Sequence, residues 1–295
     1  SFRLDLTPYV KPGGKNVLVV RLSPSNNSSR WYPGGGLYRN VWLVKTAPVH
    51  VGQWGTSITT PEVSKDKAIV KVEVTVDNDS ADETDVSVQT EIFALGPDGK
   101  TVGTPAATLP PATVKIPCGR SATVSGIQTI TNPRLWDIED PAMYLARTNV
   151  TENGRLVDSY ETPFGIRSIR FTADDGFHLN GKRVQLKGVC NHHDLGALGA
   201  AFNTRAAERQ LELLKEMGFN ALRTSHNPPA PELLDLCDGM GILVIDEAFD
   251  VWKRNKTRNG YGSLWDDWHE QDLRAMIRRD RNHPSVILWS IGNEV

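Results

Sequence analysis

The chain has 295 residues, of which 39% are hydrophobic and 23% are charged, and its formal net charge is −2 at pH 7. These values are typical of a soluble globular protein with room for two or more domains. The basic residues are scattered and no apolar run is long enough for a transmembrane helix, so we expect neither nucleic acid nor a membrane as a partner. The three cysteines are far apart and lack CxxC spacing, which indicates neither a zinc site nor a disulfide framework.

Residues 1–47 form a first zone with two short strand patterns. Strands are predicted over Asn16–Leu22 and Leu37–Lys45, on either side of the loop Ser23–Gly36, which is rich in Ser, Asn, Pro and Gly. This zone looks like the end of a larger β domain.

Residues 48–165 form a second zone dominated by strict alternation of apolar and polar side chains. Ala68–Val76 and Asp85–Phe93 are the clearest examples, and turn signals such as Pro97–Gly99 separate the runs. The spacing predicts an antiparallel β-sandwich of immunoglobulin type.

Residues 166–295 form a third zone, which opens with turn signals at Asp174–Gly176 and Asn180–Gly181 and then alternates strands with helices. The predicted strands are Val184–Val189, Asn220–Thr224, Ile242–Ile245 and Val286–Ile291. The predicted helices are Thr204–Met217, with Thr204 as the N-cap, Pro231–Met240 and Leu264–Arg281. An open doubly wound sheet would share this period, but no Gly-rich phosphate loop follows the first strand. We therefore predict the first half of a (β/α)8 TIM barrel.

Polar side chains follow all four of these strands. The four groups are Asn191–Asp194, Arg223–Pro228, Asp246–Asp250 and Asn293–Glu294. In a TIM barrel the chemistry takes place at the carboxyl ends of the strands. Asp246 or Glu247 could simply pair with Arg223, yet burying so many charges without use is costly. The pattern therefore favours a polar functional site over a structural surface.

The residue types in these groups suit the hydrolysis of a glycosidic bond. Glu294 can protonate the leaving oxygen as general acid, and Asn293 can bind the sugar's 2-hydroxyl. Trp252 and Trp265 offer aromatic surface for the faces of the sugar ring. The predicted substrate-binding residues are Asn293, His192, His193, Arg223, His226 and Asp250. The three histidines could instead ligate zinc, but no HExxH spacing occurs, so no metal and no cofactor are expected.

Long segments around these residues resemble the signatures of glycoside hydrolase family 2. Asn220–Pro228, Cys237–Glu247 and Arg281–Glu294 carry that resemblance in the third zone. Ser29–Leu43 is similar to the end of the family's sugar-binding jelly-roll domain. The domain order matches as well, which implies the end of a jelly roll in residues 1–47, an immunoglobulin-like sandwich in 48–165 and half a TIM barrel in 166–295.

The resemblance implies a retaining exo-acting β-glycosidase that works by double displacement. Glu294 would be its general acid/base, and the nucleophile, a glutamate near strand seven, would lie beyond Val295, so this chain by itself is expected not to complete the reaction. Asn191–Gly199 and Asp246–Trp252 resemble bacterial β-galactosidases. The resemblance therefore implies a β-galactosidase that removes terminal β-galactosides from oligo- or polysaccharides.

Other functions remain open on these residues. A β-glucuronidase or another family 2 β-glycosidase would share the same strand ends. Family members that bind magnesium carry a Glu and a His where this chain has Val251 and Lys253, so no essential metal is expected. From a different class, a non-catalytic carbohydrate-binding or scaffolding module would have no use for Glu294 beside Asn293. The resemblance also places the loop Asn26–Trp31 near the barrel mouth.

The expected partner is a carbohydrate substrate, and a homo-oligomer of the full-length enzyme is left open. The compartment is open too: the resembled bacterial enzymes are periplasmic or secreted, and a cytoplasmic location is the alternative.

Overall fold

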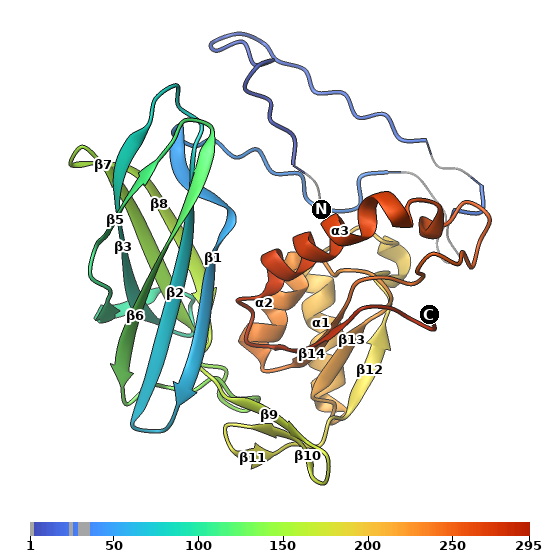
Figure 1. The fold of residues 1–295 in the computed structure, drawn as a ribbon. Coiled ribbons are helices and arrows are strands. Elements are labelled where there is room, and N and C mark those ends of the chain that lie inside the picture. The colour runs from blue at the N-terminus through green and yellow to red at the C-terminus, as the bar shows by residue number, and fades with distance from the viewer. Residues whose placement is uncertain (1–2, 24–25, 29–35) are drawn as a thin grey trace.

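A computed structural model describes residues 3–23, 26–28 and 36–295. A two-sheet β-sandwich lies beside an α/β unit, with a small β-hairpin sheet below them and an extended N-terminal segment above (Figure 1). Among the described residues, no helix is long and apolar enough to cross a membrane.

The N-terminal segment differs from the sequence prediction. The two strands expected over 16–22 and 37–45 are absent, and part of the loop expected between them lies outside the described residues. A strand is held by hydrogen bonds to a neighbouring strand, and no other described strand pairs with either stretch. Their apolar side chains are correspondingly exposed, including Val19 and Leu43. The jelly-roll origin of residues 1–47 stays a prediction.

The sandwich consists of eight strands. They are β1 (Val49–Val63), β2 (Lys67–Asn78), β3 (Thr84–Leu95), β4 (Thr101–Thr108), β5 (Ala112–Ile116), β6 (Arg120–Thr131), β7 (Tyr144–Glu152) and β8 (Arg155–Phe164). One sheet has the order β1-β2-β6 and the other β4-β3-β7-β8, with β5 also paired to β3. Every pairing is antiparallel. The predicted antiparallel β structure is confirmed, and its immunoglobulin type stays a prediction.

Side-chain alternation explains why these strands pack as two layers. In β2, every second residue from Ala68 to Val76 is buried while the intervening side chains are partly exposed. Because successive side chains of a strand point to opposite faces, one face of β2 is wholly apolar. That face joins buried residues of the other sheet, such as Val88 and Ile92, in one core. Each such burial stabilises the fold by about 1.5–3 kcal/mol.

The hairpin sheet β9 (Ile169–Thr172), β10 (Gly176–Leu179) and β11 (Lys182–Arg183) follows the sandwich. Asn180 and Gly181 have φ values of 51° and 78°, the left-handed conformations that a tight two-residue turn requires. Phe177 and Leu179 from β10 pack with Leu243 in a core beneath the parallel sheet. The hairpin therefore covers the end of the sheet opposite the strand ends that carry the polar groups.

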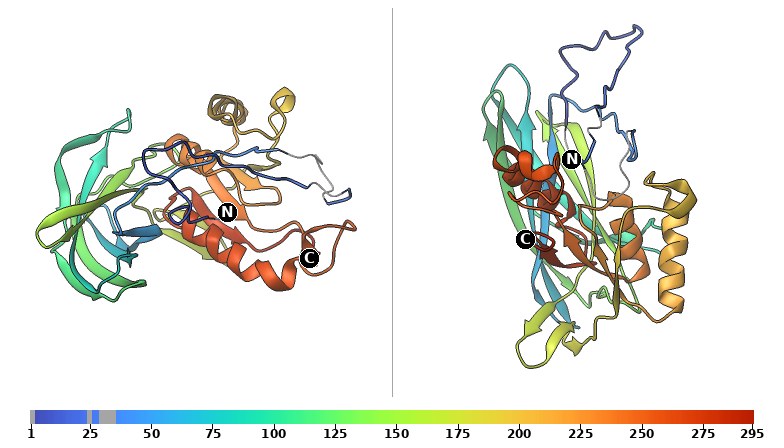
Figure 2. Two further views of the ribbon diagram at one scale, coloured as in Figure 1. Left: turned by 90° about the horizontal axis from the view of Figure 1, so that it is seen from above. Right: turned by 90° about the vertical axis from the view of Figure 1, so that its right-hand side faces the viewer.

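The α/β unit holds a parallel sheet in the order β12-β13-β14-β15. Its strands are β12 (Gly188–Asn191), β13 (Ala221–Thr224), β14 (Leu243–Glu247) and β15 (Val286–Ser290). The crossovers contain the helices α1 (Thr204–Glu216), α2 (Pro231–Met240) and α3 (Trp265–Asp280), and two short 3-10 helices, η1 (Gly196–Leu198) and η2 (Tyr261–Ser263). Figure 2 shows this unit from two further sides. The predicted alternation of four strands with three helices is thus observed.

Several boundaries in this unit differ from the prediction, and two of the differences have a clear physical reason. The first parallel strand begins at Gly188 instead of Val184, because Lys182 and Arg183 still pair with the hairpin and the chain must leave it before joining the next sheet. The N-cap of α1 is Asn203 instead of Thr204, since the Asn203 side chain accepts a hydrogen bond from the Ala206 amide at 3.0 Å.

The sandwich is fixed to the loop that leads into β15. Trp136 is fully buried and its indole donates to the Asp238 carbonyl at 2.8 Å. Asn282 exchanges two hydrogen bonds of 2.9 Å with the backbone of Thr56 and Ile58 in β1. Arg167 donates to the Val286 carbonyl at 2.6 Å. These contacts set the position of β15, the strand that ends at the Asn-Glu pair.

Candidate active site

The last residue of β14, Glu247, organises the strand ends. Its carboxylate is fully buried. Oε2 accepts hydrogen bonds from Arg223 Nε at 2.9 Å and Nη2 at 2.5 Å, and from Ser290 Oγ at 2.6 Å. Oε1 lies 2.6 Å from Nδ1 of His226. A buried carboxylate is tolerated only with such partners, so Glu247 fixes the Arg223 and His226 side chains in return.

Asn293 extends this network beyond the end of β15. It is nearly buried, and its Oδ1 accepts from Arg223 Nη2 at 3.1 Å while its Nδ2 donates to Asp250 Oδ1 at 3.1 Å. The Asn293 amide nitrogen also donates to the Phe249 carbonyl at 3.0 Å. The Asn293 side chain faces the donor Arg223 on one side and the acceptor Asp250 on the other. Only one orientation of its side-chain amide satisfies both hydrogen bonds. Four of the predicted substrate-binding residues therefore belong to one connected network: Arg223, His226, Asp250 and Asn293.

A lysine outside the predicted set completes the network. Nζ of Lys256 donates to the carbonyl oxygens of Asn293 and Asp250 at 2.7 and 2.8 Å. It also lies 3.3 Å from Oδ1 of Asp250 and 3.4 Å from Oε2 of Glu294. Lys256 thus connects the carboxylates of Asp250 and Glu294 to the backbone of Asn293.

Glu294, the second glutamate at these strand ends, differs from Glu247 in its exposure. Its side chain is 72% exposed, whereas the carboxylate of Glu247 is sealed beneath it in the network. Glu294 adopts a φ of 52°, which is uncommon for a residue other than glycine and recurs at functional sites. The two glutamates at these strand ends therefore differ in kind: Glu247 holds other side chains, and Glu294 faces solvent.

The two predicted histidines after β12 are placed differently. The ring of His192 packs edge-on against the ring of His226, with centroids 5.2 Å apart. His193 instead lies 5.9 Å from the ring of Tyr38 in the N-terminal segment. Burial lowers the pKa of His193, and the nearby charges of Arg39 and His192 lower it further. His192 thus adjoins the Glu247 network, while His193 belongs to the contact with the N-terminal segment.

Aromatic side chains line the loop after β14. The Trp252 indole donates to the Ile291 carbonyl at 2.8 Å and the ring is partly exposed, so it remains available as a surface. Trp265 packs against Phe249 and Tyr261 at centroid distances of 5.1 and 6.3 Å and belongs to a local core. Of the two predicted platform residues, Trp252 is the more exposed.

The N-terminal segment crosses these same loops. The Tyr38 carbonyl accepts from the Phe202 amide at 3.1 Å, and Arg39 donates to the Pro228 carbonyl at 3.2 Å. The carbonyls of Asn26 and Asn27 accept from Asn259 at 2.7 and 2.9 Å. The predicted loop 26–31 is therefore described only in part: residues 26–28 lie against the loop after β14, and 29–31 lie outside the described residues.

A cavity of about 250 Å³ adjoins the network. Asp250 and Lys256 supply charge to its wall, and Phe249 and Tyr261 supply apolar surface. Its volume is just below the usual range for small-molecule sites.

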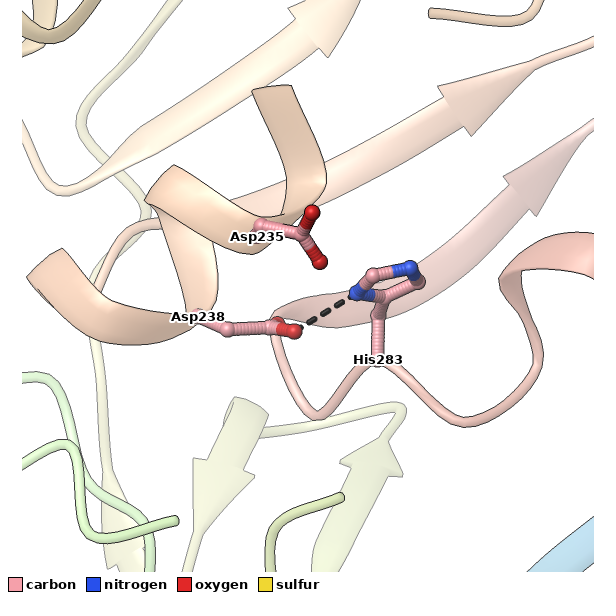
Figure 3. A group of neighbouring side chains, drawn as sticks. All are labelled: Asp235, Asp238 and His283. Atoms are coloured by element: carbon pink, nitrogen blue, oxygen red, sulfur yellow. Dashed lines mark hydrogen bonds and ion pairs between the residues drawn. The ribbon is translucent and has the colours of Figure 1, made fainter. Parts of the chain in front are cut away.

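Among the described residues, one group of side chains could bring metal-ligand atoms within 4.8 Å of one another: Asp235, Asp238 and His283. It lies where α2 meets the loop before β15 (Figure 3). Oδ2 of Asp238 is 2.6 Å from Nδ1 of His283, and Oδ1 accepts from the Ser285 amide at 3.0 Å. Burial alone would lower the pKa of His283, but Asp238, Asp280 and Asp235 together raise it to about 9. In this structure the His283–Asp238 pair is an ion pair that connects two elements.

Sequence comparison identifies the family. Residues 54–167 match the family described as glycosyl hydrolases family 2, and residues 171–295 match the TIM barrel domain of the same family. The chain belongs to glycoside hydrolase family 2. The second match also confirms that the parallel sheet is the start of a TIM barrel.

Three relatives illustrate the similarity. A β-galactosidase of Bacteroides ovatus, BoGH2A, is 48% identical over all of this chain, which covers 34% of that protein. The structure of a family 2 member from Bacteroides cellulosilyticus superposes with a TM-score of 0.84 at 42% identity, over 90% of this chain and 34% of the other. A Bacteroides uniformis β-glucuronidase 2, covalently bound to cyclophellitol-6-carboxylate aziridine, gives a TM-score of 0.76 at 31% identity, over 91% of this chain and 32% of the other. The chain thus spans about a third of the length of these family 2 relatives.

Proposed function

We propose that this chain is part of a retaining exo-acting β-glycosidase, with Glu294 as the general acid/base. The observation that carries the proposal is the place of Glu294 directly after Asn293, whose side chain the hydrogen bonds with Arg223 and Asp250 hold beyond the carboxyl end of β15. That network offers fixed donors and acceptors at the carboxyl ends of parallel strands, where a TIM barrel binds its substrate.

In the proposed reaction, Glu294 first donates its proton to the glycosidic oxygen while a second carboxylate attacks the anomeric carbon. It then takes a proton from the water that releases the sugar. The attacking carboxylate would come from a part of the enzyme beyond Val295, about 5–5.5 Å from the acid/base as retaining enzymes require. The covalent adduct of the Bacteroides uniformis relative supports a mechanism with a covalent intermediate.

Asn293, Arg223 and His226 would bind the hydroxyls of the terminal sugar. Their partners hold them in place before the substrate arrives, so little ordering cost falls on the reaction step. Asp250 would accept a hydrogen bond from a further hydroxyl, with His192 and His193 at the neighbouring strand end.

A β-galactoside is the proposed substrate, with a β-glucuronide as the alternative. The charges at the described strand ends favour the galactoside over the glucuronide. Arg223 faces the carboxylate of Glu247, and Lys256 faces those of Asp250 and Glu294. Neither cation offers uncompensated positive charge to the carboxylate of a glucuronide, whereas a neutral galactose needs none. The identity to the Bacteroides ovatus β-galactosidase points the same way.

The domain assignments are part of the proposal. Residues 1–47 would be the end of a jelly-roll sugar-binding domain and 48–165 an immunoglobulin-like sandwich that supports the barrel in 166–295. Asn282, in the loop before β15, is hydrogen-bonded to β1, and Trp136 is hydrogen-bonded to α2; both contacts favour this role.

The test is kinetic and uses the full-length protein that contains this chain. Hydrolysis of p-nitrophenyl β-galactoside is compared with that of the β-glucuronide, and NMR follows the first-formed anomer. We expect galactoside turnover with retention of configuration. Glu294→Gln should lower kcat/KM for phenyl β-galactoside by about 100- to 10,000-fold and should abolish the basic limb of the pH–rate profile. Unchanged hydrolysis of the phenyl substrate by this variant would refute the acid role, and no turnover of any β-glycoside would favour a non-catalytic module.

A further inference from the structure

Lys256 occupies an unusual position for a lysine in a surface loop. Its side chain is only 19% exposed, and its ammonium group contacts the backbone and side chain of Asp250, the backbone of Asn293 and the side chain of Glu294. A lysine side chain loses about 2 kcal/mol of rotamer entropy when it is fixed. Four acceptors on three residues around one ammonium offset that cost and define a single position for it.

The loop that carries Lys256 is held at both ends. At its start, the Trp252 indole donates to the Ile291 carbonyl just after β15. At its end, the backbone of Gly262 packs so closely on the carbonyls of Trp252 and Lys253 that an added Cβ would lie 2.7 and 2.8 Å from them. The loop thus closes on itself, and Lys256 lies between these fixed points.

The same loop is also bound by the N-terminal segment. Asn259, three residues after Lys256, donates its backbone and side-chain NH groups to the carbonyls of Asn27 and Asn26 at 2.9 and 2.7 Å. The backbone of this loop therefore connects the contact of Asn259 with residues 26–27 to the contact of Lys256 with Glu294.

We propose that Lys256 is a positioning residue that orients the acid/base Glu294, and that Asn259 transmits the position of the N-terminal segment to it. This inference rests on the proposed glycosidase function. Proton transfer from Glu294 to a leaving oxygen requires a heavy-atom distance of about 2.6–3.2 Å. The ammonium restricts where the carboxyl group can lie, and its contact with the Asn293 carbonyl fixes the backbone from which that group projects.

A positioning role predicts a dependence on the leaving group that a purely structural role does not. Phenol needs a proton from the acid to leave, whereas 2,4-dinitrophenol leaves without one. The parameter kcat/KM reports the glycosylation step. For Lys256→Met we expect kcat/KM to fall by about 100-fold with phenyl β-galactoside and by less than about fivefold with the 2,4-dinitrophenyl substrate. Lys256→Arg, which keeps the charge, should recover part of the loss with phenyl β-galactoside.

Asn259→Ala provides an independent variant outside the Lys256 side chain. The loss of the side-chain hydrogen bond to the Asn26 carbonyl should lower kcat/KM for phenyl β-galactoside by about tenfold, again with a smaller effect on the dinitrophenyl substrate. Lys253→Ala is the matched control, because Lys253 lies in the same loop but, among the described residues, forms its ion pair with exposed Asp266 at 2.8 Å. It should leave both substrates unaffected.

The measurements use the full-length protein, with thermal melting to show that each variant is folded. Equal losses on both substrates for Lys256→Met and Asn259→Ala would overturn the inference in favour of a structural role, and so would no loss on either. If the wild-type protein hydrolyses no β-glycoside at all, the proposed function fails and the inference fails with it. A wild-type enzyme that is active, with variants that ignore the leaving group, rejects the inference alone.

Discussion

The ion pair between Asp238 and His283 predicts how stability depends on pH. The pair lies 2.6 Å apart between α2 and the loop before β15. Asp238→Asn keeps the size of the side chain, removes its charge and can still accept the hydrogen bond from the Ser285 amide. The substitution thus isolates the charge that holds the proton on His283.

The sign of the effect follows from linkage. The pKa of His283 is raised in the folded state from 6.5 to about 9, through Asp238, Asp280 and Asp235 and against the effect of burial. A histidine with a raised folded pKa stabilises the fold fully below pH 6.5, and this contribution is lost as the pH rises through 9. The shift corresponds to about 3 kcal/mol. In a domain of this size each kcal/mol moves Tm by about 2–4 °C, so the contribution is worth about 6–12 °C.

The assay is differential scanning calorimetry of wild type and Asp238→Asn between pH 6 and 10. The difference in Tm between the two proteins should be largest near pH 6 and should shrink by about 6–12 °C as the pH passes 9. Other titrating groups act on both proteins and cancel in the difference. A Tm difference that stays constant across this range would show that the charge on His283 does not stabilise the fold.

Two further predictions concern the carboxylates at the end of β14. Glu247→Gln leaves the partly buried Arg223 without its counter-charge, so it should destabilise the protein by about 3 kcal/mol, measured as a loss of Tm, and should raise KM for the galactoside. A stable variant with unchanged KM would contradict the organising role of Glu247. Burial, and then the neighbouring Asp280, raise the pKa of Asp246, so the folded state holds this proton more tightly than the unfolded chain and stability falls as the pH rises above about 4. Asp246→Asn should therefore stabilise the protein at pH 8 more than at pH 5, and equal Tm shifts at the two values would refute this.

The elements of the parallel sheet were predictable because their signals are local. α2 begins at its proline and ends before Gly241, whose φ of 68° suits only glycine-like residues. Period-two alternation of apolar and polar residues likewise predicts sandwich strands such as β2. The strands expected near Val19 and Leu43 failed for the opposite reason. A strand depends on a partner elsewhere in the chain, and the composition of the strand itself does not reveal whether that partner is present.

The candidate site also contains residues that local signals predict and contacts that depend on distant parts of the chain. Arg223, His226, Asp250 and Asn293 could be predicted because each lies in or just after the carboxyl end of a strand, and parallel strands bring their carboxyl ends together. The alternative that Glu247 pairs with Arg223 is also borne out in the geometry, but its fourfold role as partner of Arg223, His226, Ser290 and the Thr224 hydroxyl needs the register of three strands.

Lys256 had no such signal, because it lies in an irregular loop where neighbouring lysines are solvated. Lys253, three residues earlier, forms an exposed ion pair with Asp266. The sequence alone does not show which of the two lysines points toward the site. Only the closure of the loop on itself and its contact with residues 26–27 direct one lysine inward and leave the other outside. A site built from strand ends can be inferred from sequence spacing, whereas the residues that adjust it lie on loops whose path depends on contacts with distant segments.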